Sequence, residues 1–248
     1  MKKRSRVTRL AKFVLRGGRR RVGPAGLLQH PPRYVLFDFD GTLADTFSVG
    51  VEILNVLAEE FRFRPLPPEE VSLARELSTR GLMKHLGIPR MKLPHISKRG
   101  TEEIGKRIDS IVPLPEMPEL VRKLHAQGFR LGILTSNSEA NVNAFLKNHD
   151  LEVFDFVKSS SKLLGKASVL RRLMRELHLK PRQIFFVGDE LRDIEAAQET
   201  GVHIAAVTWG YNSTPALTEA APDYLFTNPS EISDLLETMP IKVDVGDK

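Results

Sequence analysis

Short apolar segments alternate with helical patterns along the chain from Tyr34 onward. Continuous apolar runs predict buried strands, and apolar residues at helical spacing predict amphipathic helices. The predicted strands cover residues 33–37, 130–134, 154–158, 183–187, 202–207 and 224–226. The predicted helices cover residues 47–61, 139–147, 167–177 and 191–200, with Gly201 as the C-cap of the last one. This alternation predicts an α/β fold with a doubly wound, Rossmann-like parallel sheet that is covered by helices on both faces.

One long segment does not follow this alternation. Residues 47–112 show helical patterns and proline-punctuated turns but no convincing buried strand. Residues 66–68, 81–92 and 113–118 are rich in proline or glycine and predict turns or hinges. We therefore expect a core formed by residues 33–46 and 113–240, with residues 47–112 inserted as a small helical cap domain.

Basic and acidic residues are distributed unevenly along the chain. Ten of the 37 Lys and Arg residues precede Pro31, while the first acidic residue is Asp38. The other 27 basic residues face 31 Asp and Glu, so the folded body is expected to be slightly acidic. A block of like charges resists packing, and residues 1–32 are therefore predicted to be a basic tail.

The tail leaves several interpretations open. It could bind nucleic acid or an anionic membrane through phosphate contacts, act as an organellar targeting segment, or be disordered without a partner. No apolar run in the chain reaches the length of a membrane helix, and the best N-terminal candidate is interrupted by Lys12. We expect a cytoplasmic protein, or an organellar one if the tail is a targeting peptide.

The amino-acid composition limits the possible chemistry. The chain has no cysteine, which excludes disulfides, thiolate catalysis and Cys-type zinc sites. Its seven His residues form no paired zinc motif. A hard cation held by carboxylates is therefore the expected metal site.

The first chemistry-bearing motif follows the strand predicted at residues 33–37. It contains two carboxylates two positions apart, Asp38 and Asp40, followed by Gly41 and Thr42. One carboxylate at such a strand end can attack phosphorus, while the other, kept protonated, supplies a proton to the leaving oxygen and later activates water. Gly41 permits a sharp turn that could aim backbone amides at phosphate oxygens.

A second motif follows the strand predicted at residues 130–134. Thr135, Ser136 and Asn137 stand at the start of the next helix, where a hydroxyl and free amides can bind an anion or simply cap the helix. Lys166 is a third candidate, because a point charge near a helix start suits a phosphate.

The fourth motif follows the strongly apolar strand predicted at residues 183–187. Asp189 and Asp193 are one helical turn apart, so both carboxylates can face one magnesium ion. Carboxylates at this position could also merely complement the helix dipole. Together with Asp38 and Asp40, however, four carboxylates at one sheet edge would repel strongly without a cation.

In these motifs the sequence resembles the haloacid dehalogenase superfamily of hydrolases. That family's pattern is Asp-x-Asp-Gly-Thr after a strand, a Thr or Ser after a later strand, a Lys, and Gly-Asp-x-x-x-Asp. All four occur here in order, and the resemblance covers about residues 33–237. The chain is most similar to the branch that resembles phosphoglycolate phosphatase and carries a helical cap.

The resemblance implies a role for each aspartate. Asp38 would be the nucleophile that forms an aspartyl-phosphate, and Asp40 the general acid and base. Mg²⁺ would bind Asp38, Asp189 and the carbonyl of Asp40, with Asp193 in its first or second coordination shell. The implied enzyme is a Mg²⁺-dependent phosphatase that acts on a small phosphorylated metabolite.

The resemblance also implies roles for the surrounding residues. Thr135 would hold a phosphoryl oxygen, Lys166 would offset charge on the transferring group, and Gly41, Thr42, Ser136 and Asn137 would line the phosphate pocket. Lys162 remains an alternative to Lys166, which we prefer because it opens the helix leading into the fourth motif. Arg80 is similar in placement to a cap arginine that contacts substrate in some relatives, although it could equally be an ordinary surface residue.

Two other functions compete with a phosphatase. A sugar phosphomutase of the same superfamily would share every catalytic residue and differ in how long the aspartyl-phosphate survives. A docking protein could retain this core while its basic tail contacts nucleic acid or an anionic membrane. A dehalogenase is disfavoured, because that chemistry has no leaving alkoxide for Asp40 to protonate.

Overall fold

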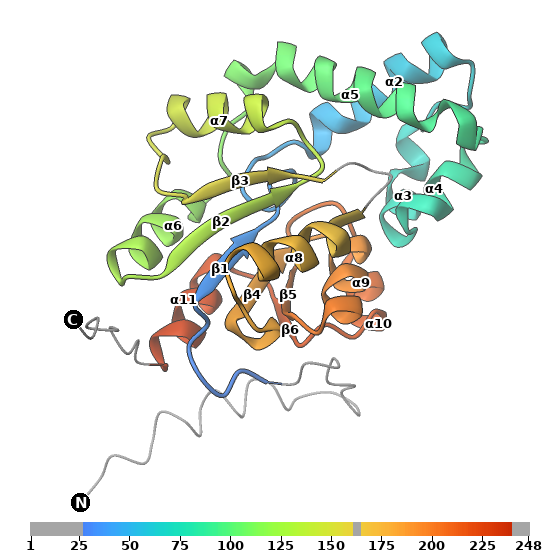
Figure 1. Cartoon of the computed structure of the whole chain (residues 1–248). Coiled ribbons are helices and arrows are strands. Elements are labelled where there is room, and N and C mark those ends of the chain that lie inside the picture. Colours follow the sequence, from blue (N-terminus) through green and yellow to red (C-terminus); the bar gives the residue numbers. More distant parts are fainter. Residues whose placement is uncertain (1–26, 161–164, 240–248) are drawn as a thin grey trace, which may run out of the picture.

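A parallel β-sheet forms the centre of the protein, as seen in the computed structural model (Figure 1). The structure describes residues 27–160 and 165–239. The six strands have the order β3-β2-β1-β4-β5-β6. They are β1 (Tyr34–Phe37), β2 (Arg130–Thr135), β3 (Phe156–Ser159), β4 (Ile184–Gly188), β5 (His203–Val207) and β6 (Tyr224–Phe226). Every neighbouring pair is parallel, so the strands end at one common edge.

Alternate residues of each strand pack on opposite faces of the sheet. In β1, Val35 and Phe37 belong to one apolar cluster, while Tyr34 and Leu36 belong to another. Helices α6 (Met117–Ala126), α7 (Glu139–Asn148) and α11 (Pro229–Glu237) contribute to the first cluster, and α8 (Gly165–Glu176), α9 (Leu191–Thr200) and α10 (Thr214–Glu219) to the second. Because both faces of the central strands β1 and β4 are buried, these two strands are apolar throughout. The predicted doubly wound parallel sheet is confirmed.

The helices between β1 and α6 form a group of their own beyond the ends of the strands (Figure 1). They are α2 (Phe47–Phe61), α3 (Val71–Glu76), α4 (Thr79–His85) and α5 (Leu93–Lys106), with 3₁₀ turns at Pro68–Glu70, Arg90–Lys92 and Ile108–Ser110. A separate small apolar cluster holds them together, and it includes Ile53, Leu57 and Leu86. We call residues 47–112 the cap. The two segments that join the cap to the sheet run side by side: the amide of Asp45 donates to the carbonyl of Val112 at 2.9 Å.

Some local predictions need correction. Turns or hinges were expected at residues 113–118. The chain does turn at residues 115–116, but α6 begins at Met117, with Pro118 in its first turn. Proline is well tolerated there, because the first amides of a helix have no partner within the helix. Helices α10 and α11 were not predicted, and both also carry a proline in the first turn.

The predicted tail overlaps the described chain only at its end. Leu28 is buried in the first apolar cluster, and its amide donates to the hydroxyl of Tyr224 at 2.6 Å. The packed part of the protein therefore begins before the predicted boundary at residue 32. Residues 1–26, which contain the basic block, lie outside the described residues, as does Lys162.

Candidate active site

Three strand ends bring the sequence motifs together. Strand β1 lies between β2 and β4, with Phe37 in register with Ile133 on one side and Val187 on the other. Asp38 therefore emerges next to the ends of both neighbours. The chain leaves β1 towards β2 and β3 and later returns to β4 on the other side, so this edge is the point at which such sheets bind ligands.

A buried cluster of three carboxylates and one ammonium group occupies this edge. Asp38, Asp189 and Asp193 each offer a carboxylate oxygen within 4.8 Å of the others. Lys166 reaches them from the first turn of α8, with its Nζ 2.6 Å from Asp38 Oδ2 and 2.5 Å from Asp193 Oδ1. All four side chains are almost fully buried. Full ionisation of the three carboxylates would leave excess negative charge beside the single ammonium group, which is the electrostatic setting that a divalent metal ion fits.

Asp189 is positioned by loops from two parts of the chain. The hydroxyl of Thr42 donates to its Oδ1 at 2.5 Å, and the amide of Tyr211 donates to its Oδ2 at 2.7 Å. Gly41 has a φ of +77°, and a Cβ at that position would meet Asp189 Oδ2 at 2.5 Å. Glycine is therefore needed at residue 41 for both its backbone conformation and the space it leaves.

Burial alters the acidity of the cluster. It raises the pKa of Asp38 to about 7, even though Lys166 opposes the shift. Burial and the neighbouring charge of Asp38 raise the pKa of Asp189 well above its ordinary value. Burial alone would lower the pKa of Lys166. The nearby carboxylates of Asp193 and Asp38 outweigh the effect of burial, so the pKa is raised. Without a further cation, Asp38 and Asp189 thus resist ionisation.

Asp40 occupies a different environment from Asp38. Its carboxylate accepts from Asn137 Nδ2, at 3.2 Å to Oδ1 and 3.3 Å to Oδ2. Asn137 is itself oriented, because its Oδ1 accepts from the amide of Ser138 and from Asn141 Nδ2. Removal from water raises the pKa of Asp40, with Arg192 opposing the shift. A carboxyl group with a raised pKa, held by a neutral amide, is suited to carrying a proton.

The remaining members of the second motif have distinct contacts. Thr135 is fully buried at the end of β2, and its Oγ1 accepts from the amide of Asn137 at 2.9 Å. Ser136 accepts through Oγ from Arg192 Nη2 at 3.1 Å. Arg192 also forms an ion pair with Glu190, at 2.6 Å from Nε to Oε2.

The loop after β1 differs from expectation in one respect. The amides of Gly41 and Thr42 donate to the carbonyls of Ala44 and Phe39, at 3.0 and 3.3 Å. They therefore close the loop rather than standing free for a phosphate. Thr42 contributes through its hydroxyl instead.

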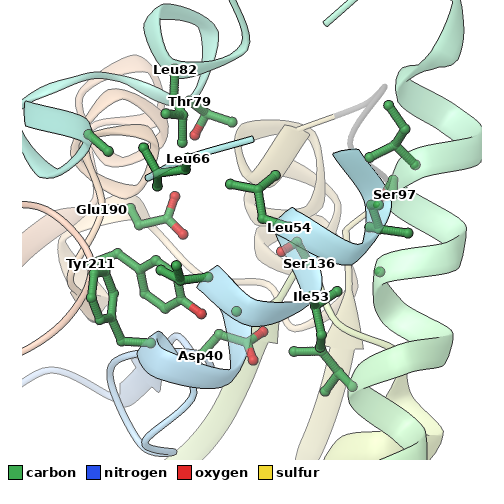
Figure 2. A pocket seen from close by; sticks show the side chains of 18 of the residues that line it. Asp40, Ile53, Leu54, Leu66, Thr79, Leu82, Ser97, Ser136, Glu190 and Tyr211 are labelled. Carbon is green, nitrogen blue, oxygen red and sulfur yellow. The ribbon is translucent and has the colours of Figure 1, made fainter. Parts of the chain in front are cut away.

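A cavity of about 280 Å³ extends from Asp40 into the cap. Figure 2 shows Asp40, Glu190 and Tyr211 at one side of this cavity and Leu54, Leu66 and Leu82 around the rest. Ser136 and Asn137 also line it. Arg80 is exposed and is not among the lining residues, whereas Arg75 is. The site thus combines acidic groups at the sheet edge with a partly open cavity for an organic group.

Several residues at the site were missed by sequence reasoning. Arg75, Glu190, Arg192, Tyr211 and Asn212 all line the cavity. The segment 208–213 follows β5 at the same sheet edge as the motifs, so its position after a strand was an available signal. Arg75 lies in a short helix and had no comparable signal.

The cap is attached to segment 208–213 by hydrogen bonds. Asn212 Nδ2 donates to the carbonyls of Arg75 and Leu77, at 2.8 and 3.0 Å, and the amide of Ser213 donates to the Arg75 carbonyl at 2.9 Å. In the opposite direction, Arg75 Nη2 of the cap donates a hydrogen bond to the carbonyl of Gly210 at 2.7 Å. The segment that holds Asp189 therefore also holds α3 of the cap.

Residues 35–207 match the family model for haloacid dehalogenase-like hydrolases. The chain belongs to this family. It is 33% identical to the phosphoglycolate phosphatase of Synechococcus elongatus over 199 residues, which cover 80% of this chain and 94% of that protein. It is also 27% identical to the phosphoglycolate phosphatase of Haemophilus influenzae over 221 residues, which cover 81% and 96% of the two chains. The predicted membership of the haloacid dehalogenase-like hydrolases, with phosphoglycolate phosphatases as relatives, is confirmed.

Solved structures share the fold. A predicted phosphatase from Clostridium acetobutylicum superposes with a TM-score of 0.72 at 22% identity and covers 84% of this chain and all of its own. CbbY from Rhodobacter sphaeroides, solved with phosphate, superposes with a TM-score of 0.65 at 20% identity and covers 82% and 99% of the two chains. Within residues 27–160 and 165–239, no helix is long and apolar enough to span a membrane.

Proposed function

We propose that this hydrolase is a Mg²⁺-dependent phosphatase that cleaves a small phosphate monoester through an aspartyl-phosphate on Asp38. One observation carries the proposal: the two aspartates of the first motif lie in different environments. Asp38 contacts Lys166 beside two further carboxylates, while Asp40 accepts from the neutral side-chain amide of Asn137 and lines the cavity. This division matches a nucleophile and a general acid.

In the first step, an oxygen of Asp38 forms a bond to phosphorus as the bond between phosphorus and the leaving oxygen breaks. Asp40 gives its proton to that oxygen, so the leaving group departs as an alcohol. In the second step, Asp40 accepts a proton from water as the water oxygen attacks phosphorus. The bond between phosphorus and Asp38 then breaks, which frees inorganic phosphate and restores both aspartates.

The surrounding residues stabilise the charge of the transferring group. Lys166 is buried and cationic beside Asp38, so its charge acts with little screening. Ser136 and Asn137 line the space in front of Asp40, and their polar groups can bind phosphoryl oxygens. Thr135 stabilises the turn that carries Ser136 and Asn137, because its Oγ1 accepts a hydrogen bond from the amide of Asn137.

Asp38, Asp189 and Asp193 are the residues that would hold Mg²⁺. Their oxygen-only donor set suits this hard cation. Burial, with the neighbouring carboxylates, raises the pKa of Asp38 and of Asp189, and a bound cation would favour the ionised form of both. When bound, the ion supplies positive charge for the phosphoryl oxygens. Asp40 does not belong to this carboxylate cluster, so any contribution from Asp40 would come from its backbone carbonyl.

The test is phosphate release from a panel of esters that includes phosphoglycolate, the substrate named for the relatives, with Mg²⁺ or with EDTA. We expect Mg²⁺-dependent turnover by the wild type and a loss of at least about 10³-fold in Asp38→Asn. Acid-quenched, ³²P-labelled enzyme should carry phosphate in the wild type and not in Asp38→Asn. Turnover that persists in a folded Asp38→Asn protein would refute the assignment of the nucleophile.

A further inference from the structure

The cavity at Asp40 has an apolar interior. Helices α2, α3, α4 and α5 of the cap and the loop before α3 all contribute apolar side chains to its wall. The side chains include Leu54, Leu57, Leu66, Leu77, Leu82 and Ile96. Figure 2 shows Leu54 of α2 among the side chains that line this cavity.

The leaving group must lie on the side of the site that Asp40 faces, since this residue protonates the leaving oxygen in the proposed reaction. Asp40 lines the apolar cavity. A second cavity is lined by hydroxyl and amide side chains such as Ser97, Asn141 and Ser159, and Asp40 is not among its lining residues. The geometry therefore directs the leaving group into the apolar cavity.

The cations of this cavity are already engaged. Arg192 is paired with Glu190 at 2.6 Å. Arg75 lies over the ring of Phe47, 4.7 Å from its centroid, and donates to the carbonyl of Gly210. A carboxylate on the leaving group would have to displace Glu190 from Arg192 or detach Arg75 from the contacts that hold the cap. Otherwise it would be buried without a counter-charge, which is strongly unfavourable.

We propose that the substrate's leaving group is an uncharged alcohol with an apolar body several carbons long, which occupies this cavity. The inference rests on the proposed phosphatase activity and specifies its substrate class. The cavity, at about 280 Å³, is close to the lower limit of roughly 300 Å³ for small-molecule sites. Glycolate, with two carbons and a negative charge, matches neither its size nor its wall.

The test compares n-alkyl phosphates from ethyl to hexyl with phosphoglycolate. Each methylene buried in the cavity should raise kcat/KM by about two- to four-fold. Hexyl phosphate should therefore be preferred over phosphoglycolate by at least about tenfold. A flat chain-length series, or a preference for phosphoglycolate or for a sugar phosphate, would overturn the inference while leaving the phosphatase intact.

A matched pair of variants on α2 tests whether the leaving group lies in this cavity. Leu54 lines the cavity, whereas Val56 is 48% exposed and does not. Leu54→Gln should lower kcat/KM for hexyl phosphate about tenfold and leave ethyl phosphate nearly unchanged, while Val56→Gln should change neither. Leu82→Gln is the second variant if Leu54→Gln fails to fold. An unchanged chain-length series in folded Leu54→Gln and Leu82→Gln would place the leaving group elsewhere.

A binding measurement separates the two proposals. Alkylphosphonates cannot be hydrolysed to an alcohol, so their affinity can be measured by calorimetry with Mg²⁺ present. We expect affinity to rise with chain length in the wild type and to rise less in Leu54→Gln. If no ester were turned over, the phosphatase proposal would fail, and this chain-length dependence would still decide whether the cavity binds apolar groups.

Discussion

Lys166 Nζ lies 2.6 Å from Asp38 Oδ2, although the two residues are 128 positions apart in the chain, and both side chains are buried. The same ammonium group contacts Asp193 at 2.5 Å. A single buried cation thus joins the proposed nucleophile to a proposed metal ligand. Its removal would leave two carboxylates without this counter-charge.

Lys166→Met is accordingly predicted to lower kcat by about 10²- to 10³-fold, the usual effect of removing one charge-stabilising group. Lys162→Met, the alternative from the sequence, serves as the matched control and should retain near-wild-type kcat. Initial rates at saturating substrate measure the effect, with circular dichroism to confirm folding. The opposite ranking of the two variants would transfer the role to Lys162.

Asp40→Asn is predicted to separate the two chemical steps. With p-nitrophenyl phosphate, whose leaving group needs no proton, the first step should be slowed only modestly. Hydrolysis should fall by about 10²-fold or more, because no base activates water. A burst of p-nitrophenol followed by slow turnover would show accumulated aspartyl-phosphate. If the burst and the steady-state rate were slowed equally, Asp40 would not act as acid in the first step and as base in the second.

The stability of the metal-free protein should decrease as pH rises. The pKa of Asp38 is raised from 3.8 to about 7 in the folded state, so the folded form holds a proton that the unfolded form releases between these values. Asp189 shifts in the same direction. The contribution of Asp38 to stability is thus present below about pH 4, decreases as pH rises towards 7 and is absent above it.

This relationship can be measured with Asp38→Asn, whose residue 38 side chain cannot ionise. In EDTA at pH 8, the variant should have a higher Tm than the wild type, and the difference should shrink as pH falls towards 4. Mg²⁺ at 100 times its Kd should stabilise the wild type by about 2.7 kcal/mol and the variant by much less. A wild-type Tm that does not respond to Mg²⁺ would contradict the assigned metal site.

Asn212→Ala is predicted to loosen the cap without disturbing the sheet. The Asn212 side chain is buried and donates to two carbonyls at the end of α3, so its loss should cost about 1–3 kcal/mol locally. Hydrogen–deuterium exchange should accelerate in residues 71–77 and remain unchanged in β1 and β4. Thr218→Ala, in the exposed part of α10, is the control and should leave exchange in residues 71–77 unchanged. Exchange that accelerates equally in β1 would indicate general destabilisation instead.

Much of the core could be predicted because its signals are local. The strands at Tyr34–Phe37 and Ile184–Gly188 are continuous apolar runs, and burial on both faces requires that pattern. Helix α6 was missed because prolines 115 and 118 were interpreted as turn signals, although proline is compatible with a first helical turn. The short helices α3 and α10 have too few residues for a clear periodic pattern.

The sequence by itself determined the sheet, the inserted helices and the carboxylates at the strand ends, because parallel strands place their carboxyl ends at one edge. Only the tertiary structure decided which arginine lines the cavity, Arg75 rather than Arg80, and how segment 208–213 joins Asp189 to the cap. It also showed that most of the side chains that the cap contributes to the cavity are apolar. These features depend on contacts between segments far apart in the chain, which no periodicity or motif spacing encodes.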